Sequence, residues 1–574
     1  MKKIAAQDKT YYCLIIFFSC LLFGIFFRHL FSVNTVFELV DEYGYLANAE
    51  YFSRGKWECK LAGYYGYGYS LLLIPLFFLC KTGSQLIHGA ILINSIIVVF
   101  LFWVEIAVTS KLCTKMDRYL RVLVSFILCF YPYIVSSSMK ILCECLLSLM
   151  IWGVWLLLFK VFETKQIRFC VLLGIALAYL FYIHTRTIPV IGAVLLIIVF
   201  LYFQKYIEIK QLAACLFPCI IVFGIGYWIK QELIKELYVG QILDNVSGKG
   251  PANIINLDYI KTRLNWLFSK DFKFYGYSLA CKVFYLFVSS LGLFPVGIYS
   301  IAKAAVSDLK KKQLSNVVII KMSIGFSFVI MILAILASGA GRLDQYSYFY
   351  YGRYYEYLVL PIFFLGINYC LNEELKTKTL IYMILIFLLS GIVCIALSKY
   401  LTNLNTSVVD TSRVVSFMYG AQNTTNYKEM IQYMLCLTTL GMVIIIAVIR
   451  NKKIKSAILI PVGLLFFVNG RYTEMEIIRV NQVGLGDNYI AEYLDEKCDD
   501  EQIHFVNYDY KYERFYTRMQ VLLGSSSIIV VELEEIEKIP KGTYFVTYNI
   551  PLDFFDGRCE QIMEGNAFRL YRRL

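Results

Sequence analysis

The sequence predicts an α-helical polytopic membrane protein with about thirteen transmembrane helices, followed by a small extracytoplasmic α/β domain. Of its 574 residues, 59% are hydrophobic and only 17% are charged, which is more apolar surface than a soluble protein of this size buries in one core. Apolar runs recur from residue 11 to residue 470. Many of them approach the roughly 20 residues that a helix needs to cross a bilayer. The bilayer is therefore the predicted solvent.

The first apolar run, residues 11–31, is longer than the apolar core of a signal peptide and lacks a small-residue cleavage pattern after it. We predict that it is retained as the first span. The stretch from Ser70 to Cys80 is too short to cross and predicts a helix on the membrane surface. Twelve further spans are predicted near residues 84–108, 119–136, 141–159, 169–183, 188–203, 211–229, 279–302, 318–338, 358–371, 379–397, 432–449 and 456–470, and the pair within 169–203 also fits a re-entrant hairpin.

The charged loops predict the orientation in the cell membrane. The net charge is +13, but the lysines gather between apolar runs and not along one basic face, so nucleic acid is not an expected partner. Short basic loops mark the cytoplasmic side. Counting the predicted spans from a cytoplasmic N-terminus places Lys310, Lys311 and Lys312 on the cytoplasmic side. The same count places residues 32–69, 230–278 and 484–574 on the extracytoplasmic side.

The first outer loop, residues 32–69, contains the adjacent acids Asp41 and Glu42 at the start of a predicted helix. Acids at such a position can simply satisfy the free N–H groups of the helix. Close to the membrane surface, however, an unpaired carboxylate is costly, and a function or a cation would offset that cost. Two carboxylates can act as a general base or as ligands of a divalent cation such as Mg or Mn. Asp41 and Glu42 are therefore candidates for both roles.

Further polar groups reach the same predicted face from other segments. Glu144 opens a span and can also hydrogen bond to a neighbouring helix, whereas Arg186 can either reach the lipid headgroups or bind a phosphate. Carboxylates, basic groups and aromatic rings on one membrane face suit the transfer of a sugar from a lipid phosphate. The candidates besides the acidic pair are Lys140, Glu144, His184, Arg186, Arg342, Arg353 and Glu356, with Tyr45 and Tyr67 from the first outer loop.

Five short segments carry a resemblance to a known family. They are the acidic pair after the first span, GYYGYGYSLLLIPL, SMKILCE, HTRTIPV and YGRYYEYLVLP. With these segments, most of residues 1–370 resembles the GT-C superfamily of membrane glycosyltransferases, which includes protein O-mannosyltransferases and bacterial aminoarabinose transferases. The resemblance implies a catalytic membrane domain over residues 1–470, a linker over 471–483 and an extracytoplasmic domain over 484–574.

The resemblance also implies the reaction and the roles of the residues. A sugar would pass from a polyprenyl-phosphate donor to an acceptor, which is a protein, a glycolipid or a wall polymer, with inversion at the anomeric carbon. Asp41 would be the general base, and Glu42 its partner or a metal ligand. The donor phosphate would be held by Arg186, Arg353, Arg342 and Lys140, with Glu144, His184, Tyr45, Tyr67 and Glu356 in support.

Two other functions fit parts of the pattern. A transporter or flippase for a lipid-linked saccharide would also need many spans, but it favours ionisable residues near the bilayer midplane and paired internal repeats. A polymerase or ligase for surface polysaccharides would use a large outer loop, and residues 230–278 contain Lys249, Arg263 and Trp266.

The tail alternates short helices and strands. Because it has no glycine-rich phosphate loop, we expect it to bind the acceptor or to stabilise the loops of the site. Helices are predicted over 487–497 and 512–524, and strands over 503–509, 525–531, 543–550 and 567–573.

Overall fold

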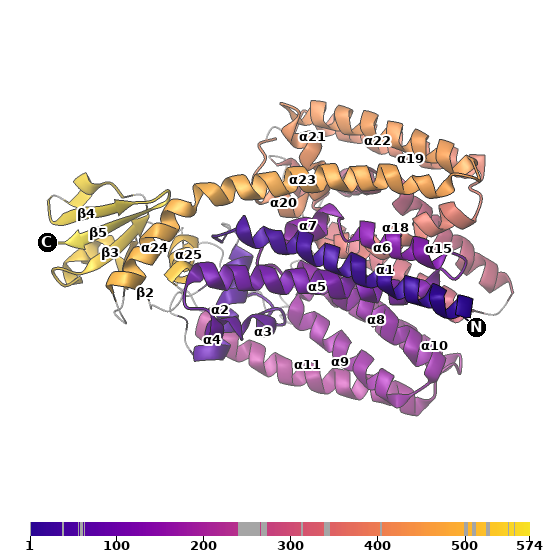
Figure 1. Cartoon of the computed structure of the whole chain (residues 1–574), viewed down its shortest axis with the longest axis horizontal. Coiled ribbons are helices and arrows are strands. Elements are labelled where there is room, and N and C mark those ends of the chain that lie inside the picture. The colour runs from indigo at the N-terminus through magenta and orange to yellow at the C-terminus, as the bar shows by residue number, and fades with distance from the viewer. Residues whose placement is uncertain are drawn as a thin grey trace.

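Long helices lying side by side form most of the molecule, and a small α/β domain projects from one end of the bundle (Figure 1). This is the arrangement that the sequence predicts. The computed structural model describes residues 2–36, 40–55, 57, 61, 64–238, 265, 272–311, 314–337, 345–401, 404–498, 503–507, 513–523, 528–548, 550–555 and 557–574.

The helical bundle contains both long helices and short helices near its ends. Its helices are α1 (Lys2–Phe27), α2 (Val40–Arg54), α3 (Ser70–Leu73), α4 (Leu76–Leu79), α5 (Gly83–Leu112), α6 (Arg118–Leu128), α7 (Pro132–Ser138), α8 (Glu144–Thr164), α9 (Ile167–Ile183), α10 (Ile188–Phe203), α11 (Ile209–Leu237), α14 (Phe272–Ser290), α15 (Leu293–Lys310), α16 (Asn316–Ala337), α17 (Tyr346–Tyr350), α18 (Glu356–Asn372), α19 (Thr377–Leu397), α20 (Asp410–Arg413), α21 (Met418–Gln422), α22 (Tyr427–Arg450) and α23 (Leu459–Val483).

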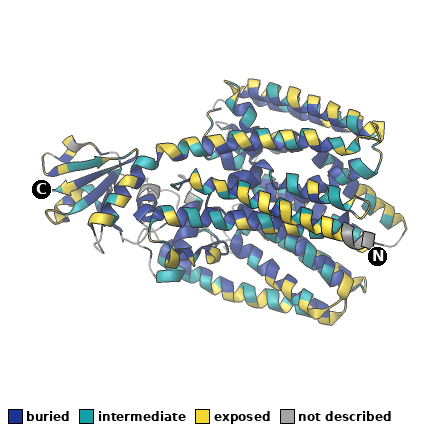
Figure 2. Ribbon diagram, in the orientation of Figure 1, coloured by how far each residue is buried: buried dark blue, intermediate teal, exposed yellow. Residues whose placement is uncertain are grey.

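The multi-span architecture predicted from the sequence is confirmed. In the part of the chain that the structure describes, nine helices are long and apolar enough to cross a membrane, or up to 12 if each of three bent pairs counts as one span. The 17-residue apolar helix α9 occupies the remaining predicted position. Exposed residues follow the outward faces of the bundle (Figure 2), and large apolar side chains such as Phe217, Leu389 and Phe467 are among them. Lipid is the solvent that such a surface fits.

Two predicted spans, near 119–136 and 279–302, are broken in the structure, which corrects the sequence-based expectation of single helices there, and a third bend lies just before the span predicted at 358–371. The chain bends by 56° between α6 and α7, by 103° between α14 and α15, and by 72° before α18. The sharpest bend follows Leu291 and Gly292, whose φ angles are 49° and 77°. That left-handed conformation interrupts a helix, and Pro295 follows in the first turn of α15.

Glycines allow α15 and α18 to pack closely. A Cβ atom at Gly297 would collide with the carbonyl oxygen of Ile362, and one at Gly366 would collide with that of Leu293. Small residues at crossing points are how membrane helices gain van der Waals contact. This contact packs the middle of α18 against the first half of α15.

The C-terminal domain contains α24 (Leu485–Lys497), α25 (Glu513–Leu523) and a five-stranded sheet of order β2-β1-β3-β5-β4. β1 is parallel to β2 and β3, whereas β5 is antiparallel to β3 and β4. The predicted helices and four predicted strands are present, but the sequence did not predict the edge strand β4. The strands are β1 (Ile503–Asn507), β2 (Ile528–Glu532), β3 (Tyr544–Tyr548), β4 (Cys559–Glu564) and β5 (Phe568–Arg573).

The domain is joined to the bundle through α23 and through α25. Residues 471–483, expected as a linker, are helical and form the second half of α23, which runs from the bundle to the domain (Figure 1). On the other side, α25 contacts α2 and α5, and Gly83 lies against the backbone of Val521 and Leu522. The domain thus packs directly on the helix that begins with the acidic pair.

Candidate active site

The acidic pair lies in the first turn of α2, and its two side chains have different partners. The Asp41 carboxylate is 26% exposed and lies 2.5 Å from Nη2 of Arg353. Glu42 is buried, and its Oε1 accepts a hydrogen bond of 3.0 Å from the backbone N–H of Ile141. Successive residues of a helix point about 100° apart. Asp41 therefore faces the cavity described below, while Glu42 faces the turn before α8.

Arg353 connects two carboxylates. It belongs to the short 3₁₀ turn Gly352–Tyr354 between α17 and α18. Its Nε donates to Oε1 of Glu144 over 2.6 Å, while its Nη2 faces Asp41. The side chain is only 8% exposed. A guanidinium held at one edge presents its other edge in a fixed direction, which is how arginine recognises planar or tetrahedral anions.

Glu144 and Arg186 complete the ion cluster. Glu144 is the first residue of α8 and is 1% exposed, and its Oε1 also accepts from Nη2 of Arg186 over 2.8 Å. Nη1 of Arg186 reaches the carbonyl oxygen of Arg353 at 3.3 Å, and the hydroxyl of Tyr357 donates to the carbonyl of Arg186. Two carboxylates and two guanidinium groups from four chain segments thus balance one another. The sequence predicted that these segments would meet at one face.

A cavity of about 230 Å³ lies beside the cluster. Asp41 and Arg353 contribute its charged wall, and His184 adds an imidazole whose Nδ1 accepts a hydrogen bond from the backbone N–H of Arg186. Burial and the adjacent Arg186 lower the pKa of His184 well below its ordinary value, so the ring is neutral. The rest of the wall is mainly aromatic, and consists of Tyr64, Tyr65, Gly66, Thr185, Tyr351 and Tyr354.

Lys140 lies away from this cavity. Its Nζ donates to the hydroxyls of Ser136, Thr411 and Ser412 over 3.1, 2.5 and 2.6 Å. Burial is the main reason that its pKa falls to about 7, partly offset by the negative charge of Glu42. The predicted phosphate contact of Lys140 remains a prediction, because in this structure the amine contacts hydroxyls of the segment that contains α20.

The predicted supporting residues lie around the cluster. Oε1 of Glu356 accepts from the hydroxyls of Tyr131 and Tyr285 over 3.2 and 2.5 Å. The hydroxyl of Tyr45 contacts the sulfur of Cys143 at 3.0 Å, and the ring of Tyr67 stacks on that of Tyr182. These contacts hold the starts of α8 and α18 in place. Four predicted positions, Arg342, Lys249, Arg263 and Trp266, lie outside the described residues.

Sequence reasoning did not select several residues that the structure places here. Tyr64, Tyr65, Tyr351 and Tyr354 line the cavity, and the only signal for them was the density of tyrosines in the segments that contain Arg353 and Tyr67. No feature of the sequence indicated that Thr411 and Ser412 would contact Lys140, because two hydroxyl residues in a polar loop are common.

The divalent cation that the resemblance allowed has little support from the side chains. Among the described residues, no group of three or more His, Cys, Asp and Glu is arranged to hold a metal ion. Asp41 pairs with Arg353, and Glu42 accepts from the backbone of Ile141, so the two carboxylates do not face one point. The cation remains a prediction, and no step below uses it.

Comparison with known proteins identifies the fold. No family model and no curated protein matches the sequence. Among solved structures, ArnT from Cupriavidus metallidurans bound to undecaprenyl phosphate matches 98% of both chains with a TM-score of 0.53 at 11% identity. ArnT in the apo state matches 99% of this chain and 98% of its own with a TM-score of 0.54 at 10% identity. ArnT is an aminoarabinose transferase of the GT-C superfamily. The chain has the GT-C fold.

A third solved structure is similar with a lower score. The Archaeoglobus fulgidus oligosaccharyltransferase tethered to an acceptor peptide matches 94% of this chain and 69% of its own, with a TM-score of 0.44 at 10% identity. The two ArnT structures match the whole chain, including the C-terminal domain, and confirm the predicted GT-C fold. At 10–11% identity the shared property is the fold, so the chemistry rests on the side chains described above.

Proposed function

We propose that this GT-C protein transfers a sugar from a polyprenyl-phosphate-linked donor to a hydroxyl group of an acceptor at the extracytoplasmic membrane face. One observation carries the proposal. The partly exposed carboxylate of Asp41 forms an ion pair with Arg353 at the cavity wall, and a second ion pair with the buried Glu144 holds Arg353 in place. The structural neighbour ArnT was crystallised with undecaprenyl phosphate, which supports a lipid phosphate as part of the donor. The acceptor would be a protein, a glycolipid or a wall polymer.

Arg353 is the group best suited to the donor phosphate. Its Nε is engaged by Glu144, so the edge that carries Nη2 is the one presented to the cavity. A phosphate oxygen can replace the Asp41 carboxylate on that edge without moving the arginine, since both are oxyanions that guanidinium binds in similar geometry. Arg186 supports this position through Glu144 and through the carbonyl of Arg353.

The same exchange would free Asp41 to act as the base. A carboxylate in contact with a guanidinium has its oxygens engaged by N–H donors, whereas a carboxylate released from that contact can accept a proton from a nearby hydroxyl. Asp41 then takes the proton of the acceptor hydroxyl, whose oxygen attacks the anomeric carbon opposite the phosphate. The bond from that carbon to the phosphate oxygen breaks, its electron pair leaves with polyprenyl phosphate, and this single displacement inverts the anomeric centre. Arg353 stabilises the leaving phosphate.

The structure favours Asp41 over Glu42 as this base. Asp41 lines the cavity, whereas Glu42 is buried and accepts from Ile141 in the turn that leads into Glu144. We therefore propose that Glu42 positions the start of α8. The C-terminal domain would support the site in a similar way, because its helix α25 packs on α2.

The proposed sidedness has the cytoplasmic N-terminus and the extracytoplasmic C-terminal domain at opposite ends of the bundle. Figure 1 has the N-terminus at the end away from the C-terminal domain, whereas α2, α3 and α4 lie at the end near that domain. A single cysteine placed at Ser53 should be labelled from outside intact cells, and one at Lys311 should not. The reversed result would put the cavity on the wrong side for an extracytoplasmic donor.

The decisive assay measures transfer of radiolabelled sugar from polyprenyl phosphate by the purified full chain in vesicles. Removal of a general base typically slows a reaction by about 10²–10⁴-fold, so Asp41→Asn should lose most activity. Glu42→Gln should retain it, because a glutamine oxygen can accept the same bond from Ile141. Asp308→Asn is the matched control, since the Asp308 carboxylate accepts hydrogen bonds from Ser315 near the opposite end of the bundle. Wild-type transfer by Asp41→Asn would refute the mechanism.

A further inference from the structure

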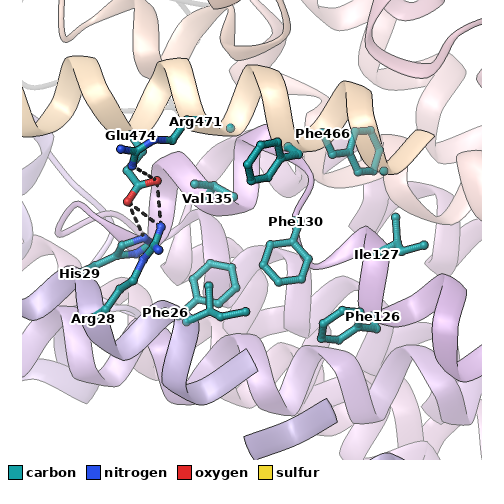
Figure 3. Close-up of a pocket in the computed structure, with 14 residues that line it drawn as sticks. Phe26, Arg28, His29, Phe126, Ile127, Phe130, Val135, Phe466, Arg471 and Glu474 are labelled. Atoms are coloured by element: carbon teal, nitrogen blue, oxygen red, sulfur yellow. Dashed lines mark hydrogen bonds and ion pairs between the residues drawn. The ribbon is translucent and has the colours of Figure 1, made fainter. Parts of the chain in front are cut away.

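A second cavity, separate from the candidate active site, opens between α1, α6, α7 and α23 (Figure 3). Its volume is about 530 Å³. Phenylalanines from three helices form its floor and sides: Phe26 from α1, Phe126 from α6, and Phe466 and Phe467 from α23. Phe467 is 69% exposed, so the cavity is open along the apolar side of the bundle. We call this cavity the α1–α23 groove.

The end of the α1–α23 groove nearest the C-terminal domain is polar. Nη2 of Arg28 donates to both carboxylate oxygens of Glu474 over 2.8 and 3.0 Å, and Nη1 of Arg471 lies 3.0 Å from Oε2 of the same residue. Glu474 is 8% exposed, whereas Arg28 and Arg471 are 56% and 49% exposed. Two accessible guanidinium groups therefore share a single buried carboxylate. Figure 3 shows this cluster at one end of the groove and the aromatic rings along the rest of it.

We infer that the α1–α23 groove binds one anionic phospholipid of the membrane, with an acyl chain along the phenylalanines and the phosphate on Arg28 and Arg471. An apolar groove that faces lipid gains dispersion contacts when a hydrocarbon chain fills it. Its volume falls within the roughly 300–1,000 Å³ of small-molecule sites, which suits a chain and not an additional helix.

The charge of the cluster identifies the headgroup. Arg28 and Arg471 with Glu474 carry a net charge of +1 when all three are ionised. That charge matches the single negative charge of a phosphodiester, whereas a phosphate monoester carries about −1.5 to −2 near neutral pH. Arginines near an anionic surface add to lipid affinity. The groove therefore favours a phosphodiester lipid with a net negative headgroup, such as phosphatidylglycerol, over a zwitterionic phosphodiester lipid whose headgroup cation offsets the phosphate charge and would be repelled by the two arginines.

The position of the groove gives the bound lipid a structural role. α23 continues from the groove into the C-terminal domain, and Val135 of α7 lines the groove one residue before Ser136, which contacts Lys140. A lipid seated there would pack α1 against α23, and Arg28 in the 3₁₀ turn that follows α1 is already paired with Glu474 of α23. This role does not depend on the proposed sugar transfer, and its failure would leave that proposal untouched.

The test is native mass spectrometry of the purified, delipidated full chain with phosphatidylglycerol or phosphatidylcholine added. The wild type should retain one phosphatidylglycerol more strongly than phosphatidylcholine, and Arg28→Ala/Arg471→Ala should lower phosphatidylglycerol affinity by roughly tenfold or more. Gly463→Leu should weaken both lipids without altering charge, since a Cβ at Gly463 meets only open space.

Two substitutions are matched controls. Arg479→Ala removes an exposed arginine of α23 that pairs with Glu476 outside the groove, and Gly224→Leu adds volume at an open glycine of α11. Both should bind phosphatidylglycerol as the wild type does. Unchanged binding in both Gly463→Leu and the double arginine variant would overturn the inference. A retained species with the mass of a polyprenyl phosphate or of a polypeptide would overturn it as well.

Discussion

Replacing Glu144 by glutamine should destabilise the protein by about 3–5 kcal/mol, the usual cost of removing one partner from a buried ion pair. Glu144 is 1% exposed and accepts from both Arg353 and Arg186, which are themselves 8% and 5% exposed. Water therefore cannot replace the lost negative charge. Among the described residues, Asp41 would then be the carboxylate that still forms an ion pair with one of these two buried guanidinium groups.

A second substitution tests whether charge balance is the cause. Glu144→Gln/Arg186→Met removes one cation as well as the carboxylate. The double variant should therefore recover part of the free energy of unfolding that Glu144→Gln loses. Residues in direct contact typically couple by about 0.5–3 kcal/mol. If instead the two losses add, the contact between Glu144 and Arg186 contributes little.

The assay is unfolding in mixed micelles at increasing SDS fraction, followed by tryptophan fluorescence. Glu163→Gln is the control, because Glu163 forms an exposed pair with Lys111 and such pairs contribute at most about 1 kcal/mol. Equal unfolding midpoints for Glu144→Gln and Glu163→Gln would refute the charge-balance reasoning.

Three other predictions concern the surroundings of the site. Glu356→Gln should change the free energy of unfolding little, because its amide oxygen can still accept hydrogen bonds from two tyrosine hydroxyls. Glu356→Ala should lower the free energy of unfolding by about 1–3 kcal/mol for each tyrosine hydroxyl left without an acceptor. Unfolding of the two variants in SDS measures the difference. Lys140 has a folded-state pKa of about 7, below its ordinary 10.5, so the unfolded chain binds more protons between these values. Stability should therefore rise with pH across that window relative to Lys140→Met, and a parallel pH dependence of the two unfolding free energies would contradict it. Gly366→Leu should disrupt the contact between α15 and α18 and lower the thermal midpoint and yield of folded protein, while Gly153→Leu, at an open glycine, should not.

The sequence predicted the spans well because span length and loop charge are local properties. Every predicted span coincides with a helix or a bent pair of helices. The bend between α14 and α15 escaped prediction because it depends on the left-handed backbone conformation of Leu291 and Gly292, which lie inside one continuous apolar run. Strand β4 was missed because the polar and apolar residues of CEQIME do not alternate and it contains a single β-branched residue.

For the candidate site, counting the spans from the N-terminus showed which segments lie at the same membrane face, but it could not show which side chains of those segments form pairs. It placed Asp41, Glu144, Arg186 and Arg353 at one predicted face. The hydrogen bond from Arg353 to Glu144 joins residues 209 positions apart, and only packing decides such a pair. The same limit explains Lys140, which was predicted to bind phosphate but whose amine contacts Thr411 and Ser412 in this structure.

The charge of the ion cluster leads to a last prediction, which separates donor binding from chemistry. The cluster is balanced before a donor phosphate arrives, so the phosphate must compete with Asp41 for Nη2 of Arg353. Asp41→Asn removes that competitor and the base together. The variant should therefore bind polyprenyl phosphate more tightly, by up to about fivefold for a partly exposed pair worth about 1 kcal/mol, while transfer falls by about 10²-fold or more. Equilibrium binding and single-turnover transfer measured on the same preparation distinguish the two effects. Weaker binding by Asp41→Asn would mean that Asp41 holds Arg353 in place for the donor and does not compete with it.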